Sequence, residues 1–157
     1  MARRRQATKR TIPNDPMYET PMVTALVNIV MRDGKKNTAR RIVYSAIEKV
    51  NEGKKEGNPL EILEKAMDNI KPRLEVKSRR VGGATYQVPM EVTPERQLAL
   101  AVRWLVGYAS GRKGTPMPKA LAFEIKEAAA GQGNAIKKRD DVHRMAQANK
   151  AFAHLRW

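Results

Sequence analysis

Two histidines and two adjacent aspartates near the C-terminus are the side chains whose types could perform acid–base or metal chemistry. His143 and His154 lie eleven residues apart, about three turns on a helix, which is too far to share a metal or to act with one base. Asp140 and Asp141 are neighbours, so on a helix they point about 100° apart and do not form a paired acid and base. We interpret the histidines as surface or RNA-facing side chains and the aspartates as charges that stabilise the positive amino end of the last helix.

The run Asp33-Gly34-Lys35-Lys36 is the second candidate for chemistry, because lysines that follow a glycine can hold a phosphate. It joins two predicted helices, so a phosphate there would meet the ammonium groups and the unpaired N–H groups at the amino end of the second helix. The upstream glycine of a nucleotide-binding P-loop is missing. The pattern therefore predicts contact with a phosphate and argues against nucleotide hydrolysis.

Composition excludes several further kinds of chemistry. The 157 residues include no cysteine, so there is no disulfide, no thiolate nucleophile and no cysteine-ligated zinc, and we expect neither a metal nor a cofactor. Lys and Arg outnumber Asp and Glu by 31 to 16, a net charge of +15 that predicts a polyanionic partner. The N-terminus is basic without a following apolar run, and no stretch is long and apolar enough to span a membrane. We therefore expect a cytoplasmic protein with no membrane partner.

The basic residues are concentrated in separate patches. Four segments totalling 60 residues hold 21 of the 31 Lys and Arg but only 4 of the 16 Asp and Glu; they are residues 1–10, 32–41, 71–86 and 134–157. The remaining 97 residues are close to neutral. Because solvated helix faces usually alternate in sign, this division favours polyanion binding over a simple solubility surface.

The candidate binding residues are cations of these patches and two aromatic side chains that could lie against bases. They are Arg3, Arg4, Arg5, Lys9, Arg10, Lys35, Lys36, Arg40, Arg41, Lys77, Arg79, Arg80, Tyr86, Lys137, Lys138, Arg139, Arg144, Lys150 and Trp157. Phe152 continues an apolar stripe and is expected in the core.

Helices must position most of these residues. Four copies of one start signal, a polar cap followed by proline, stand at Thr20-Pro21, Asn58-Pro59, Thr93-Pro94 and Thr115-Pro116. Apolar residues follow each copy at helical spacing, and two further segments keep this period without the proline. The sequence predicts a mainly α single domain of about six helices over residues 17–157, with a basic C-terminal helix at about 135–153. Residues 1–16 are expected to form a basic extended N-terminal arm.

One segment, at about 74–92, alternates polar and apolar residues around Gly82-Gly83, which predicts a protruding β-hairpin arm. A two-residue loop would put the apolar sets of the two strands on opposite faces. A three-residue loop would pair Val76 with Met90 on one face, so we expect the longer loop or a bulge. Lys77, Arg79, Arg80 and Tyr86 lie towards the tip, where the arm could probe a groove or a phosphate backbone.

Four segments resemble the bacterial small-subunit ribosomal protein seven family. The hairpin run Val76-Lys77-Ser78-Arg79-Arg80-Val81-Gly82-Gly83 continues to Thr85-Tyr86-Gln87-Val88-Pro89, and the C-terminal segment includes Asp141-Val142-His143-Arg144-Met145-Ala146 and Ala148-Asn149-Lys150-Ala151-Phe152-Ala153-His154. The Asp33-Gly34-Lys35-Lys36 loop and Arg103-Trp104 also match. The resemblance extends from about residue 20 to the end, and Leu155 departs from it because an aromatic residue is common there.

The resemblance implies a non-enzymatic structural protein that binds the 3′ domain of small-subunit ribosomal RNA and nucleates assembly of the subunit head. It further implies that the hairpin lies near the exit-site tRNA and the messenger exit path, and that small-subunit proteins nine and eleven are neighbours, with no small-molecule substrate. Two other functions stay open from the residues alone. One is an architectural DNA-binding protein that places the hairpin in a groove, and the other is an RNA-processing enzyme.

Overall fold

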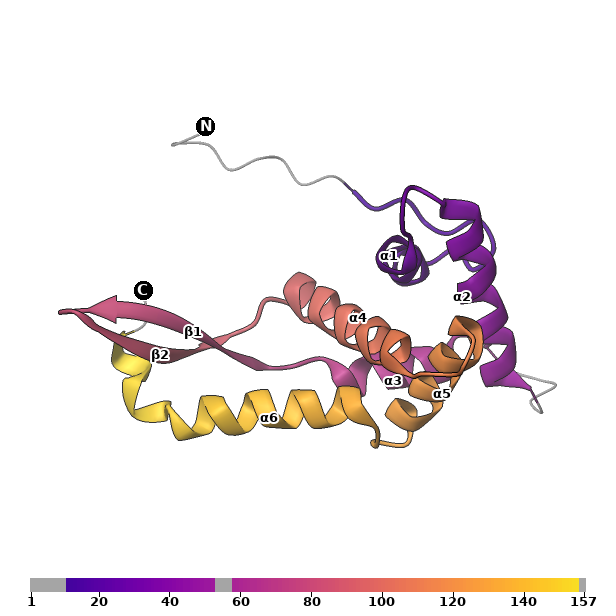
Figure 1. The fold of residues 1–157 in the computed structure, drawn as a ribbon. Coiled ribbons are helices and arrows are strands. Elements are labelled where there is room, and N and C mark those ends of the chain that lie inside the picture. The colour runs from indigo at the N-terminus through magenta and orange to yellow at the C-terminus, as the bar shows by residue number, and fades with distance from the viewer. Residues whose placement is uncertain (1–10, 53–57, 156–157) are drawn as a thin grey trace.

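The computed structural model describes residues 11–52 and 58–155, and it is mainly helical with one antiparallel hairpin, as predicted. The elements in chain order are α1 (Pro21–Val30), α2 (Lys36–Asn51), α3 (Glu61–Ile70), β1 (Leu74–Val81), β2 (Ala84–Glu91), α4 (Pro94–Gly111), α5 (Met117–Ala129), α6 (Asn134–Ala148) and a 3₁₀ helix, η1 (Lys150–Leu155). Helices α1 to α5 form a body at one end, and the hairpin projects from it (Figure 1).

Two of the four proline signals mark the first residue of a helix. Pro21 begins α1 and Pro94 begins α4, where the missing proline N–H costs no intrahelical bond. The other two helices begin slightly later. The side chain of Asn58 accepts the N–H of Leu60 at 3.0 Å, so the chain makes a turn before α3, and Pro116 is the cap of α5 instead of its first residue.

The core lies where α5 packs against α2, α3 and α4, with α1 closing one side against α2 and α4. Its largest fully buried side chains come from the predicted apolar stripes and include Leu26, Ile47, Met67, Ile70, Leu105, Leu121 and Ile125. Burying each such side chain contributes about 1.5–3 kcal/mol. The body is therefore a rigid base from which the hairpin extends.

The last helix does not stay in the body. α6 leaves it and runs beside the hairpin, and η1 then turns under the strands (Figure 1). The α-helix ends at Ala148, so the predicted helix at about 135–153 is two helices of different type. The hairpin, α6 and η1 thus project from the body together, and α6 and η1 cover one face of the hairpin. The strand pattern alone did not predict this cover.

The predicted hairpin register is wrong. The strands pair Val76 with Pro89 around a two-residue Gly82-Gly83 loop, in which both glycines have positive φ, 57° and 92°, as the tight right-twisting turn requires. The prediction assumed that the apolar residues of both strands share a face. The buried face instead combines Val88 of β2 with Glu75 of β1, a carboxylate that becomes tolerable there because it is paired.

The segment expected to be an extended arm is attached to the body at one point. Asp15 is only 3% exposed, and its carboxylate accepts the hydroxyl of Tyr44 on α2 and the backbone N–H groups of Met17 and Tyr18. Burial and this hydrogen bond raise the pKa of Tyr44. The chain is therefore fixed to α2 at Asp15.

Candidate nucleic-acid interface

The hairpin carries its predicted contacts on two different faces. The register places Lys77, Arg79 and Tyr86 on the face towards α6 and η1, and it places Arg80 on the opposite face. Arg80 is exposed, whereas Arg79 and Tyr86 are half-buried. Of these four residues, Arg80 is the one that most clearly presents a cation to a partner.

Arg79 and Tyr86 hold the C-terminal 3₁₀ helix. The Tyr86 ring packs on the Phe152 ring with centroids 5.2 Å apart, and Nη1 of Arg79 donates to the backbone oxygen of Leu155. Phe152 was expected in the core, and this expectation is wrong. The ring is half-buried against the hairpin and lies outside the main core. These contacts fix the hairpin against the end of the chain.

A charge cluster neutralises the base of the hairpin. Nε of Arg96 on α4 donates to both carboxylate oxygens of Glu75, at 2.9 and 2.7 Å, and Nζ of Lys77 lies 3.5 Å from the same carboxylate. The Glu75 side chain is nearly buried, while those of Lys77 and Arg96 stay about half exposed. The guanidinium of Arg96 therefore neutralises Glu75, and Lys77 retains much of its charge for a partner.

The loop before α2 places its two lysines at the amino end of that helix. Asp33 and Gly34 both have positive φ, 52° and 71°, which turns the chain so that Lys35 and Lys36 are exposed at the start of α2. This start has no side-chain cap and no acidic residue in its first turn. The N–H of Lys36 is bonded to the backbone oxygen of Gly34, so this end offers an anion its exposed lysines and the partial positive charge of the helix.

Arg40 and Arg41, one turn further along α2, are placed differently. Arg41 is exposed, whereas Arg40 is half-buried and its Nε is a buried donor with no partner in the part of the chain that the structure describes. Arg41 therefore extends the basic end of α2, while Arg40 belongs more to the packing of the body.

A cleft of about 380 Å³ lies beside this basic end and was not predicted. Its apolar wall includes Ile29 and Val106, and its cations are Arg32, Lys35 and Arg112. Arg112 follows α4, far along the chain from the lysine loop, so no local pattern in the sequence indicates that these residues meet. The cleft adds an apolar surface to the predicted cations.

Two acidic residues of α5 hold the Arg112 side chain. Its Nη2 donates to Oε1 of Glu124 at 2.7 Å and to Glu127, and the hydrogen bond to Glu124 raises the pKa of the guanidinium. Glu124 is fully buried. The pair therefore joins the end of α4 to α5 and fixes one wall of the cleft.

The basic residues of α6 are partly paired within the protein. Arg139 donates to Asp140 at 2.8 and 2.6 Å and to the backbone oxygen of Asn69 on α3. Arg144 is 80% exposed, with the Asp141 carboxylate 3.7 Å away. Asp140 and Asp141 lie in the middle of α6, so the prediction that they stabilise its amino end is wrong. Lys137 and Lys150 are exposed and Lys138 is half-buried.

Both histidines have contacts within the protein. Nε2 of His143 accepts the backbone N–H of Arg73 at 2.9 Å, and burial, with the nearby charge of Arg139, lowers the His143 pKa. A ring nitrogen that accepts this bond carries no proton, so His143 is a neutral link between α6 and the start of the hairpin. His154 lies 2.9 Å, through Nδ1, from the backbone oxygen of Ala151.

The remaining predicted contacts, Arg3, Arg4, Arg5, Lys9, Arg10 and Trp157, lie outside the described residues. Within the described ranges, no three acidic or histidine side chains are grouped to hold a metal ion, and no helix is suited to crossing a membrane.

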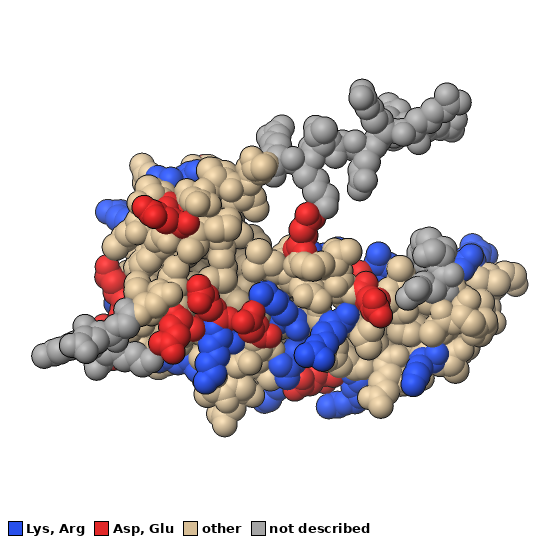
Figure 2. Space-filling view, turned by 180° about the vertical axis from the view of Figure 1, so that it is seen from behind, with Lys and Arg blue, Asp and Glu red and all other residues tan. Residues whose placement is uncertain are grey.

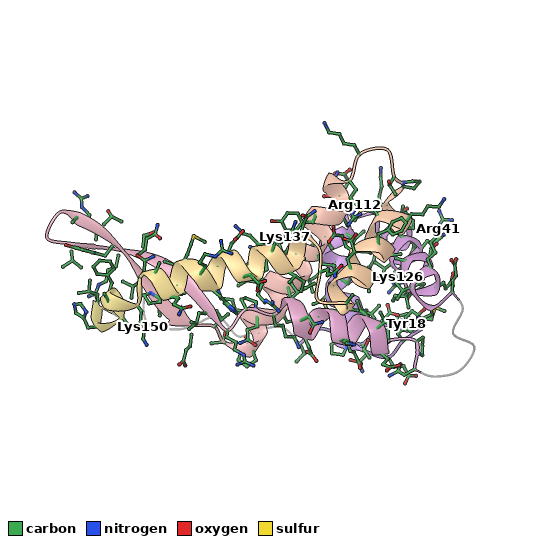
Figure 3. The ribbon with its side chains drawn as sticks, turned by 90° about the horizontal axis from the view of Figure 1, so that it is seen from below. Tyr18, Arg41, Arg112, Lys126, Lys137 and Lys150 are labelled. Atoms are coloured by element: carbon green, nitrogen blue, oxygen red, sulfur yellow. The ribbon has the colours of Figure 1, made fainter. Side chains whose placement is uncertain are left out.

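The predicted cations, together with Arg112, do not converge on one point. Figure 3 shows Arg41 and Arg112 at the helical body, Lys137 between the body and the hairpin, and Lys150 at the far end. In Figure 2 acidic and basic side chains mix over the body, while the far end of the hairpin shows Lys and Arg without Asp or Glu. A line of cations along the whole length fits an extended polyanion better than a small substrate.

Comparison with known proteins gives one result over the whole chain. The pattern of the family described as Ribosomal protein S7p/S5e matches residues 2–150. The chain is 59% identical to the small ribosomal subunit protein uS7 of Akkermansia muciniphila, 57% to that of Dictyoglomus thermophilum and 56% to that of Paenarthrobacter aurescens, each over all 157 residues and the full length of the relative. Identity at this level, over a fold whose exposed cations run from helical body to hairpin tip, means that the chain belongs to the Ribosomal protein S7p/S5e family.

Proposed function

We propose that this protein is a structural component of the small ribosomal subunit, in the cytoplasm, and that it binds the 3′ domain of the small-subunit ribosomal RNA directly. Full-length similarity to proteins named as small ribosomal subunit proteins carries the first part. The spread of exposed cations along the molecule supports the second, because a folded RNA offers phosphates over a surface of this extent.

Binding follows from the positions of the cations. The body presents Lys35, Lys36 and Arg41 at the start of α2, and the projection presents Arg80 and Lys150 at the other end. A packed core and a covered hairpin hold the two basic regions at a fixed separation. An RNA that matches this separation therefore binds without the entropic cost of ordering the protein. Shape then selects the folded RNA, while the cations neutralise its phosphates.

The projecting hairpin supports the finer part of the proposal. Binding by the body would nucleate assembly of the subunit head and leave the hairpin to reach the exit-site tRNA and the messenger exit path. Small-subunit proteins nine and eleven are the proposed protein neighbours, and the basic arm at residues 1–16 is proposed as a further RNA contact.

One observation favours a second candidate, an architectural DNA-binding protein that places the hairpin in a groove. Val81 is 38% exposed beside the Gly82-Gly83 turn, so an apolar side chain does stand at the tip. A single valine is smaller than the Phe, Leu, Ile or Met wedges that part base steps. The family match favours the ribosomal role, and it also favours a structural role over RNA processing.

The test is binding of the full chain to a transcript of the 3′ domain, to an unrelated RNA and to a random-sequence DNA duplex across a series of salt concentrations. We expect binding to the 3′ domain to persist at salt concentrations that release both competitors. Equal affinity for all three, lost together as salt rises, would reduce the protein to a general polyanion binder. Preference for the duplex would support the DNA alternative.

A further inference from the structure

A basic surface with an aromatic centre lies on the part of the chain where charges nearly balance. Phe123 on α5 is 52% exposed, whereas the other Phe, Tyr and Trp side chains of the described residues are at least partly buried. It borders a hollow of about 410 Å³ between α5 and the end of α2. We name this surface the Phe123 face, and it consists of Lys49, Glu52, Lys119, Ala122, Phe123 and Lys126.

Helix geometry groups these side chains. Lys119 lies four residues before Phe123 and Lys126 three residues after it, so both lysines share its side of α5, about 10 Å apart along the axis. Lys49 approaches from α2. Phe123 therefore has a lysine one turn before it and another one turn after it on α5, and Lys49 of α2 lines the same hollow.

The three ammonium groups have no carboxylate partner among residues 11–52 and 58–155. The ion pairs of the described chain involve other residues, and Nζ of Lys49 donates to the Ser45 hydroxyl on its own helix at 3.4 Å. Glu52 is the one acidic residue of the face, which leaves a local charge of +2. A partner for this surface must be anionic.

We propose that the Phe123 face binds an unpaired stretch of RNA, with one base stacked on the Phe123 ring and the adjoining phosphates on Lys119 and Lys126. Base stacking on an exposed ring flanked by cations is the ordinary way in which proteins hold single-stranded RNA. An acidic peptide would satisfy the lysines equally well, but apart from Phe123 the face offers only Ala122 as an apolar side chain to receive its anchor. The face is therefore better suited to a planar base than to an apolar side-chain anchor.

This RNA contact would be separate from the surface that carries the proposed function. The inference rests on the proposed function only in taking RNA as the partner. Lys126 lies on the helical body, far from Lys150 beside the hairpin (Figure 3). Phe123 also lies outside the cleft beside Lys35. The protein would then hold RNA from two directions.

The chain contains only two phenylalanines, which makes a local test possible. With 4-fluorophenylalanine incorporated, ¹⁹F NMR gives one signal from exposed Phe123 and one from Phe152, which is packed on Tyr86; the variant Phe123→Tyr assigns them. The full chain is titrated with a ten-nucleotide single-stranded RNA of mixed sequence and, separately, with an acidic peptide. We expect a saturable shift of the Phe123 signal with RNA only.

Variants test the two halves of the contact. Lys119→Gln with Lys126→Gln should abolish the RNA-induced shift of the Phe123 signal, and Lys113→Gln, an exposed lysine outside the face, should leave it unchanged. Phe123→Ala should weaken binding of the oligonucleotide about 5- to 100-fold, with Phe123→Tyr close to the parent chain, when binding to each variant is followed through α5 amide signals.

The outcomes separate this inference from the proposed function. A silent Phe123 signal in a protein that still binds the 3′ domain overturns the inference alone. A shift with the acidic peptide but not with RNA overturns it in favour of a protein partner. Loss of specific 3′-domain binding overturns the proposed function, whatever the Phe123 signal does.

Discussion

The ring of Tyr86 on β2 packs against the ring of Phe152 in η1, with centroids 5.2 Å apart and planes inclined at 52°. This pair joins the middle of the chain to its end. It also explains why the hairpin can project from the body and still keep one orientation, because its covered face rests on α6 and η1. Stability of the hairpin and presentation of its cations are therefore linked.

Replacing Phe152 by alanine is expected to loosen the hairpin without unfolding the body. The change removes the aromatic contact with Tyr86 and part of the cover of β2, at a cost of about 1–2 kcal/mol, which is below the value for a fully buried ring. Hydrogen exchange should speed up in β1, β2 and η1, with α2 and α5 protected as before. Phe123→Ala is the matched control, since that exposed ring should change stability by less than about 0.5 kcal/mol. Uniformly faster exchange in both regions would show that the hairpin and body unfold together.

Replacing Arg112 by methionine is expected to destabilise the body strongly. The fully buried Glu124 carboxylate would lose its guanidinium partner, and uncompensated buried charges are costly. Because the Arg112 side chain is 28% exposed, we expect about 2–4 kcal/mol, somewhat less than for a fully buried pair. Chemical denaturation gives the free energy of unfolding.

The double change Arg112→Met with Glu124→Gln tests the cause of this loss. If the buried charge is responsible, the double variant should recover much of the stability. Glu127→Gln, at the half-exposed partner of Arg112, should cost under about 1 kcal/mol. A double variant as unstable as Arg112→Met would mean that side-chain packing of Arg112 is what matters.

His143 gives the fold a pH dependence of defined sign. Burial and the nearby Arg139 lower its pKa in the folded protein, while Asp140 opposes this and Arg73 adds to it. The unfolded chain therefore binds the proton more readily, so stability rises with pH through the range just below the ordinary histidine pKa of about 6.5. The contribution is present above that value and is lost as pH falls through the folded pKa.

Thermal unfolding between pH 5 and 8 measures this effect. His143→Gln should flatten the pH profile relative to the parent chain, and it can still accept the Arg73 N–H through its amide oxygen. His154→Gln is the control, because that exposed ring contacts only the backbone of its own turn. An unchanged slope in His143→Gln would assign the pH dependence to other groups.

The helices and the hairpin could be predicted because their signals are local. Proline after a polar cap, and apolar residues at helical spacing, depend on neighbours within a few residues, and so does the alternation around Gly82-Gly83. The hairpin register could not be predicted this way. In the observed register, Glu75 lies on the covered face, where Arg96 of the next helix neutralises it. The alternation of polar and apolar residues within the strands gives no information on a charge partner from another helix.

Some residues of the candidate site could likewise be predicted from local sequence, and others could not. Exposed cations such as Lys35 and Arg80 are found from charge clusters, since clustering is visible in the sequence. Arg112 was missed because the cleft that it lines forms between helices distant in sequence. Phe123 was missed because it lies off the apolar stripe formed by Leu121, Ile125 and Ala128 and outside the basic segments, and the structure shows it exposed on α5.

The adjacent arginines of β1 are expected to have different roles. Arg80 is exposed on the open face, so Arg80→Ala should weaken RNA binding and reduce the salt dependence by about one phosphate contact, with the melting temperature unchanged. Arg79 holds the backbone of Leu155, so Arg79→Ala should speed up hydrogen exchange in η1 and affect RNA binding only by loosening the hairpin. Arg79→Lys distinguishes these effects, because it keeps the charge but loses the guanidinium geometry. If Arg79→Lys restores RNA binding while η1 stays loose, then Arg79 itself contacts the RNA, and the division between the two arginines is wrong.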